Sequence, residues 1–194
     1  MAIELVNIYK NFGSQNIFTN LNLRLEDGEF SAIMGPSGSG KTTLINLVCG
    51  LTLPDYGRVV GISGRKIAVV FQEDRLLEHR SGLANIQYVL QNPQQSELLI
   101  WELLAETGLA EDAHKQARDY SGGMKRRLSL CRALAYDADV IILDEPFKGL
   151  DAGIKPGIMA MVKARCANKT TLLVTHDAAE AAYFGCKIID IADL

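Results

Sequence analysis

The run Gly35–Thr42, which reads GPSGSGKT, constrains this chain more than any other stretch. It matches a phosphate-binding loop of the form G-x-x-x-x-G-K-[ST], whose glycines let backbone N–H groups turn toward an anion. In this pattern Lys41 reaches the outer phosphates of a nucleoside triphosphate, and the Thr42 hydroxyl can ligate Mg²⁺. The loop therefore predicts a triphosphate site, placed between a strand and a helix.

The residues on either side of the loop fit that setting. Phe30–Met34 is a short, largely apolar run typical of a strand, and the apolar residues after the loop recur at helical spacing until Gly50. The alternative is a flexible turn rich in glycine and serine. Such a turn requires neither the strand nor the helix, so the context favours the phosphate loop.

Composition and charge bound the remaining possibilities. The chain has 194 residues, of which 48% are hydrophobic, enough for a buried core in one domain or in a domain with a subdomain. The formal net charge of −3 gives no overall field that favours nucleic acid or an anionic membrane surface. Apolar runs reach only strand length, so we expect no membrane span in this chain.

The four cysteines show no C-x-x-C or metal-site spacing, and Met1–Glu4 has neither the charge nor the apolar stretch of a signal segment. We therefore expect a protein of the reducing cytoplasm.

Hydrophobic patterning predicts an α/β fold with two additions. Ile3–Tyr9 and Leu21–Leu25 alternate apolar and polar residues, as half-buried antiparallel strands do. Residues 73–139 have a helical pattern, which predicts an inserted helical subdomain that ends with a helix over Ser121–Tyr136. From residue 140 strands and helices alternate, up to a last strand over Lys187–Ala192, which indicates a parallel sheet covered by helices.

A second acidic motif follows the apolar run Val140–Leu143. An uninterrupted apolar run is typical of a strand buried on both faces, and ligands bind beyond the carboxyl ends of such strands. Asp144 is placed to hold Mg²⁺ directly or through water, and Glu145 to polarise an attacking water. The pair also fits a plain strand end or a helix cap; its combination with the phosphate loop favours the catalytic interpretation.

Ser121-Gly122-Gly123 opens the second inserted helix. One interpretation is an N-cap serine followed by glycines and a solvated basic face over Lys125–Arg127. The other is an anion site, because the start of a helix exposes free N–H groups and the positive end of the dipole. The residues alone leave both open.

Together, in this order along the chain, these motifs resemble those of the ATP-binding cassette (ABC) ATPases. The resemblance covers Ile3 to about Ala192 and includes the phosphate loop Gly35–Thr42, the Q-loop residue Gln72, the signature Ser121–Gly123, the acidic motif Asp144-Glu145, the D-loop Gly149-Leu150-Asp151 and the switch residue His176.

This resemblance implies the fold and the site. The fold is a RecA-like P-loop NTPase with a parallel sheet core, an N-terminal antiparallel β subdomain and an inserted α-helical subdomain. Residues 1–194 form a single ABC ATPase domain, with 1–72 and 140–194 as nucleotide-binding core and 73–139 as helical subdomain. ATP is bound by Phe12, which stacks on adenine, and by Gly35, Pro36, Ser37, Gly38, Ser39, Gly40, Lys41, Thr42, Thr43, Ser121, Gly122 and Gly123; the catalytic residues are Glu145, His176 and Gln72; the Mg²⁺ residues are Thr42, Gln72 and Asp144.

Two of these assignments also have a plain structural alternative. Phe12 could be a core phenylalanine, since this side chain is often simply buried. His176 could be an ordinary residue at a strand end, but it follows Leu172-Leu173-Val174 and would emerge at the sheet edge with the loop and Glu145, within reach of a γ-phosphate.

Three residues depart from the family pattern. Tyr120 stands where the signature usually begins with leucine. Met124 stands where it continues with glutamine, and methionine cannot donate the hydrogen bond that this amide would offer to ribose. The run Ser-Gly-Gly-Met followed by basic residues is similar to the signature variant that is common in importer ATPases of the nitrate, sulfonate and taurine group. Lys148 stands where the family often has a small residue, and the sequence supplies no physical account of it.

The function that the resemblance implies is an ATPase subunit that powers solute import through a separate permease, at the cytoplasmic face of the membrane. Its implied partners are a second cassette, which completes the ATP site in a homodimer, the permease and, indirectly, a solute-binding protein, with no nucleic acid. Two alternatives stay open: a soluble mechanical ATPase acting on DNA or ribosomes, and a degenerate cassette that binds ATP as a switch.

Overall fold

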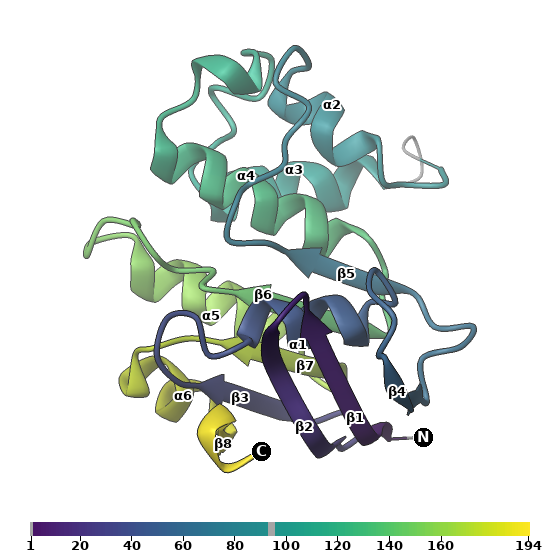
Figure 1. Ribbon diagram of the computed structural model, residues 1–194. Helices are drawn as coiled ribbons and strands as arrows, with labels where there is room; N and C mark the ends of the chain where they lie inside the picture. The colour runs from purple at the N-terminus through teal and green to yellow at the C-terminus, as the bar shows by residue number, and fades with distance from the viewer. Residues whose placement is uncertain (1, 93–95) are drawn as a thin grey trace. The chain divides into compact units, whose positions relative to one another are not determined.

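The computed structural model describes residues 2–92 and 96–194 (Figure 1). Met1, the first residue of the N-terminal segment considered above, therefore lies outside the described residues. The chain divides into two compact units. The first runs to Ile67 and includes Asp139–Asp144 and Asn168–Leu194, and the second consists of Ala68–Ala138 and Glu145–Ala167.

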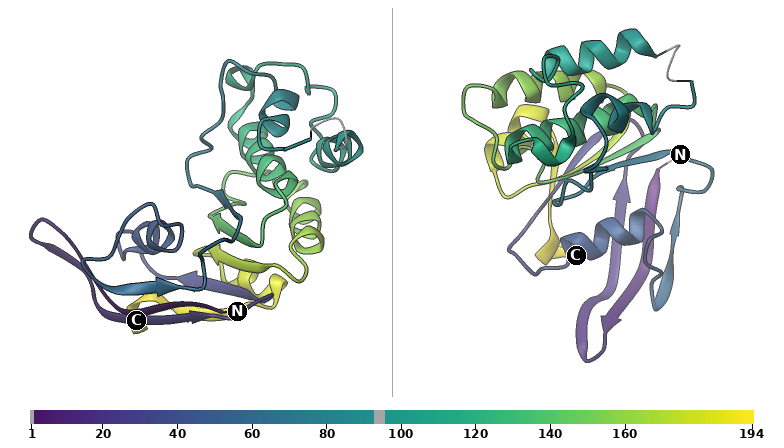
Figure 2. Two further views of the ribbon diagram at one scale, coloured as in Figure 1. Left: turned by 90° about the vertical axis from the view of Figure 1, so that its right-hand side faces the viewer. Right: turned by 90° about the horizontal axis from the view of Figure 1, so that it is seen from above.

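The first unit contains the predicted antiparallel sheet. Strands β1 (Ile3–Phe12), β2 (Gln15–Leu25) and β4 (Tyr56–Val60) lie in the order β2-β1-β4. Both N-terminal strands are longer than expected, and they meet as one hairpin in which Phe12 pairs with Gln15 (Figure 2). Burial alternates along much of β2, as it does in a strand of a sheet that has one face covered.

The parallel sheet of the first unit has the neighbouring strands β6 (Val140–Asp144), β7 (Thr170–Val174), β3 (Phe30–Met34) and β8 (Lys187–Asp190), in that order. The pairings of β6 with β7, of β7 with β3 and of β3 with β8 are parallel. Every residue of β6 and β7 is buried. This is the arrangement that near-continuous apolar runs predict.

The last strand ends earlier than the predicted Ala192. β8 stops at Asp190, whose carboxylate accepts a hydrogen bond from the Ala192 N–H at 2.9 Å and so caps a short 3₁₀ helix, Ile191–Asp193. The apolar Ile191 is buried from this helix rather than from a strand.

Among the described residues of the first unit, the α-helices are α1 (Lys41–Val48) and α6 (Ala178–Phe184). α1 buries the apolar residues whose spacing predicted it: Leu44, Ile45, Leu47 and Val48.

The second unit is mainly helical. β5 (Ile67–Val70) leads into it, followed by α2 (Gly82–Gln87), α3 (Glu97–Glu106), the 3₁₀ helix η1 (Ala117–Asp119), α4 (Gly122–Ala135) and α5 (Lys155–Arg165). α4 contacts α2, α3 and α5, so it is the central helix of the unit. Arg165 of α5 reinforces the packing through ion pairs to Glu102 and Glu106 of α3.

Within residues 2–92 and 96–194, no helix is both long enough and apolar enough to cross a bilayer.

Candidate functional site

The phosphate loop has the backbone that its glycines predict. Gly35, Gly38 and Gly40 have φ of 148°, 81° and 96°, values that other residues rarely adopt. α1 begins directly afterwards, at Lys41. The Lys41 ammonium donates to the carbonyl oxygens of Gly35 and Pro36 at 2.8 and 2.6 Å, so the cation is held across the loop.

The loop fits a phosphate group on two observations. The Ser39 hydroxyl is buried, and the described residues offer it no hydrogen-bond partner. A Cβ on Gly40 would lie 2.9 Å from Cγ2 of Ile17 and 3.0 Å from Cζ of Phe18, so only glycine fits there. A buried polar atom without a partner and a helix start without a side-chain cap both suit an anion.

The parallel sheet brings three of the predicted site elements to one edge. Ile33 and Asp144 are both in register with Val174, so the loop after β3 and the end of β6 lie at the same level. His176 follows Val174 by two residues and is exposed, whereas Asp144 is only 5% exposed. The phosphate loop, a buried carboxylate and an imidazole thus meet at the carboxyl edge, where ligands bind in such sheets.

Glu145 has an unusual backbone. Its φ is +46°, in the left-handed region that non-glycine residues seldom occupy and that often marks functional sites. Its side chain is 14% exposed, and a carboxylate oxygen lies 3.1 Å from the ammonium nitrogen of Lys148. Lys148, whose presence has no explanation in the sequence pattern, therefore contacts the proposed general base.

Phe12 is not a core residue, because it is 52% exposed at the end of β1. The Lys10 ammonium lies 5.3 Å from the centre of its ring and 2.8 Å from a carboxylate oxygen of Asp55. Hydrogen bonds from Lys10 and from the Asn11 N–H hold the pKa of Asp55 below its ordinary value. An exposed ring held beside a fixed cation suits a stacking platform for a base.

The signature segment is built as a helix start. The Ser121 hydroxyl accepts a hydrogen bond from the Met124 N–H at 3.3 Å, as an N-cap does. A Cβ on Gly122 would meet nothing within 4 Å, so this side of the helix start is open. Tyr120 is buried and donates to the Asp112 carbonyl oxygen at 2.7 Å. Tyrosine in place of leucine thus anchors the segment, and burial raises the pKa of its hydroxyl.

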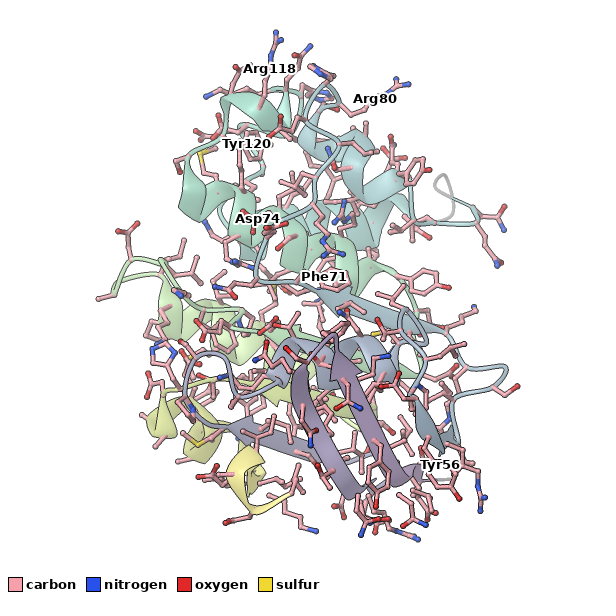
Figure 3. The ribbon with its side chains drawn as sticks, in the orientation of Figure 1. Tyr56, Phe71, Asp74, Arg80, Arg118 and Tyr120 are labelled. Atoms are coloured by element: carbon pink, nitrogen blue, oxygen red, sulfur yellow. The ribbon has the colours of Figure 1, made fainter. Side chains whose placement is uncertain are left out.

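The basic residues after the signature do not form a solvated face, which corrects one interpretation of the sequence. Arg126 is only 7% exposed and donates to the carbonyl oxygens of Phe71, at 2.7 Å, and of Gln72. Its Nε lies 3.3 Å from a carboxylate oxygen of Asp74. Figure 3 labels Phe71 and Asp74 on the segment that passes along α4.

Arg132, six residues further along α4, extends this contact. It donates to the carbonyl oxygens of Arg75 and Asp74 at 2.9 and 3.2 Å. The Arg75 guanidinium in turn stacks 3.7 Å from the centre of the Phe71 ring. Burial raises the pKa of Asp74, and the charges of Arg126 and its basic neighbours oppose that rise. Two arginines of one helix thus hold the whole Phe71–Arg75 segment.

The predicted site residues therefore fall into two groups. Gly35–Thr43, Asp144 and His176 belong to the first unit, as does Phe12 on the antiparallel sheet; Gln72, Ser121–Gly123 and Glu145 belong to the second. Sequence reasoning missed Arg126 and the role of Lys148. The only available signal was their charge, in a basic run and at a position where a small residue was expected.

Comparison with known proteins identifies the relatives of this chain. A family model described as ABC transporter matches residues 18–148. The chain is 36% identical over 199 residues to an aliphatic sulfonates import ATP-binding protein of Rhodococcus jostii, an alignment that covers 100% of this chain and 80% of that protein. It is 34% identical over 208 residues to a sulfate/thiosulfate import ATP-binding protein of Vibrio cholerae, covering 97% of this chain and 55% of the longer relative.

Solved structures of an ABC transporter cassette are also similar to this chain. The dimeric structure of a bacterial ABC transporter cassette, MJ0796, has a TM-score of 0.87 at 30% identity, covering 97% of this chain and 93% of that one. A post-hydrolysis state of the same cassette, bound to ADP and Pi, has a TM-score of 0.86 at 30% identity. These likenesses confirm the predicted fold class.

Proposed function

This chain belongs to the ABC transporter family, and we propose that it is the subunit that binds and hydrolyses ATP to power solute import through a separate permease. The observation that carries the proposal is the carboxyl edge of the parallel sheet. There the loop that holds Lys41, the buried Asp144 and the exposed His176 are brought to one level by the strand register.

The triphosphate would bind along the loop Gly35–Thr43. Its N–H groups and the start of α1 offer hydrogen bonds and a positive dipole, and the Lys41 ammonium would exchange its loop carbonyls for phosphate oxygens. Phe12 would stack on the adenine ring. We further propose that Thr42, Gln72 and Asp144 hold Mg²⁺, which neutralises phosphate charge when bound.

Hydrolysis would rest on Glu145 and His176. Glu145 follows the buried end of β6, and its largely buried carboxylate would accept a proton from the attacking water. His176 would donate a hydrogen bond to the γ-phosphate, where charge develops as the bond to the β-phosphate breaks. Gln72 would orient the same water.

The remaining proposals concern assembly. We propose that residues 1–194 form one domain, with a core of 1–72 and 140–194 and a helical subdomain of 73–139. We also propose that the start of α4 binds an anion, which none of the phosphate contacts proposed above supplies. We propose that Ser121–Gly123 completes the ATP site of a second copy, as the dimeric relative suggests. A permease would hold this dimer at the cytoplasmic face of the membrane, with a solute-binding protein acting indirectly.

Lys41→Ala tests the proposal. Loss of a charge-assisted hydrogen bond to phosphate should weaken ATP binding about tenfold to a hundredfold. Titration with a fluorescent ATP analogue measures this, and Lys115→Ala is the control, because Lys115 is exposed and pairs only weakly with Asp112 at 3.8 Å. Equal affinity of Lys41→Ala and the control would contradict the site.

A further inference from the structure

Arg126 makes an unusual set of contacts for a residue in a basic run. Its guanidinium is almost fully buried, and it binds two consecutive backbone carbonyl oxygens, those of Phe71 and Gln72, together with the Asp74 carboxylate. The planar fork of arginine permits these three contacts at once, whereas a lysine or glutamine side chain cannot make them all.

We propose that Arg126 is a positioning residue for ATP hydrolysis, because it fixes the backbone of Gln72 to the helix that begins with Ser121–Gly123. The inference rests on the proposed role of Gln72 at the reacting phosphate. A backbone held at its own carbonyl leaves the side chain of Gln72 to reach outward, and this side chain is exposed. Any movement of α4 then moves Gln72 with it.

The contacts of Arg126 differ from those of the neighbouring arginine of α4. Arg127, the next residue, has the same side chain and lies on the same helix, but it donates to the carbonyl oxygens of Gly123 and Thr107. Neither belongs to the Phe71–Arg75 segment. Arg127 therefore supplies a matched control that removes a half-buried guanidinium from α4 while the hold on Gln72 stays intact.

The first experiment compares Arg126→Gln with Arg127→Gln in steady-state ATPase assays and thermal unfolding. Displacement of a group that orients the attacking water should lower kcat by about tenfold or more in Arg126→Gln. Because the phosphate loop is unchanged, KM for ATP should stay within about twofold. Arg127→Gln should retain most of kcat, and Arg126→Lys, which keeps the charge but not the fork, should recover part of it. Equal kcat in Arg126→Gln and Arg127→Gln would overturn the inference.

A double-mutant cycle separates positioning from a general structural effect. If Arg126 acts through Gln72, then Arg126→Gln should change kcat by less than about twofold in a Gln72→Ala background. Multiplied losses would show that Arg126 acts elsewhere and overturn the inference alone. An unchanged kcat in Gln72→Ala by itself would overturn the proposed role of Gln72 and the inference with it. If Arg126→Gln does not fold, Arg126→Lys enters the same cycle.

Discussion

The ammonium nitrogen of Lys148 lies 3.1 Å from a carboxylate oxygen of Glu145, three residues earlier in the chain. The two side chains differ in environment, since Lys148 is 54% exposed and Glu145 only 14%. An ion pair with one solvated partner contributes little to folding, about 0–1 kcal/mol. It nevertheless places a positive charge next to the carboxylate of the proposed general base.

Lys148→Ala should therefore raise the rate of hydrolysis with little effect on stability. A neighbouring cation makes a carboxylate a weaker proton acceptor, and a pair worth up to about 1 kcal/mol corresponds to a rise in kcat of roughly twofold to fivefold. Lys148→Arg retains the charge and should stay near the original kcat. A fall in kcat on Lys148→Ala would show instead that the lysine orients Glu145 productively.

Two glycines of the phosphate loop differ in the space around them. Both have positive φ, but a Cβ on Gly38 would meet nothing within 4 Å, whereas one on Gly40 would press on Ile17 and Phe18. Gly38→Ala should cost about 1 kcal/mol of backbone strain, and Gly40→Ala about 1–3 kcal/mol more from the clash. Urea denaturation measures both, and equal losses would contradict the described packing.

The thiol of Cys131 should resist alkylation in the folded chain. It is fully buried beside the Thr107 hydroxyl, and burial raises its pKa to about 12. At pH 8 only about one molecule in ten thousand then carries the reactive thiolate. Raising the pH toward the pKa should speed its reaction with iodoacetamide, and urea should expose it fully. Peptide mapping reads out the label, and rapid labelling of native Cys131 at pH 8 would contradict its burial.

The sequence predicted the elements whose signal is local. Val140–Leu143 reads as a buried strand because every one of its residues is apolar, and β6 covers this run. The predicted end of the last strand, at Ala192, was wrong because Ile191 suits a strand as well as it suits the 3₁₀ turn that Asp190 caps. Only the hydrogen bond from Ala192 decides between them.

The candidate site divides in the same way. Gly35–Thr42 could be assigned because the spacing of its glycines, lysine and threonine is the pattern of a phosphate-binding loop. The contacts of Arg126 and Lys148 could not, because a basic side chain in a sequence does not reveal which carbonyl or carboxylate it meets. Arg126 binds residues that lie more than fifty positions earlier, at Phe71 and Gln72.

Glu145→Gln should separate ATP binding from hydrolysis. The amide cannot accept a proton from water, so phosphate release should fall by about a hundredfold to ten-thousandfold. The phosphate loop is untouched, and affinity for ATP should stay within about twofold. Near-normal phosphate release would remove Glu145 from the reaction.

The most direct test is the mass of Glu145→Gln in solution at saturating ATP, measured by sedimentation equilibrium. If ATP lies between the loop of one copy and Ser121–Gly123 of another, the unhydrolysed nucleotide should hold two chains together. With ATP the mass should shift from 21.2 kDa to twice that value, and it should not shift when Lys41→Ala is added. A Glu145→Gln chain that binds ATP yet stays at 21.2 kDa would contradict the two-copy site.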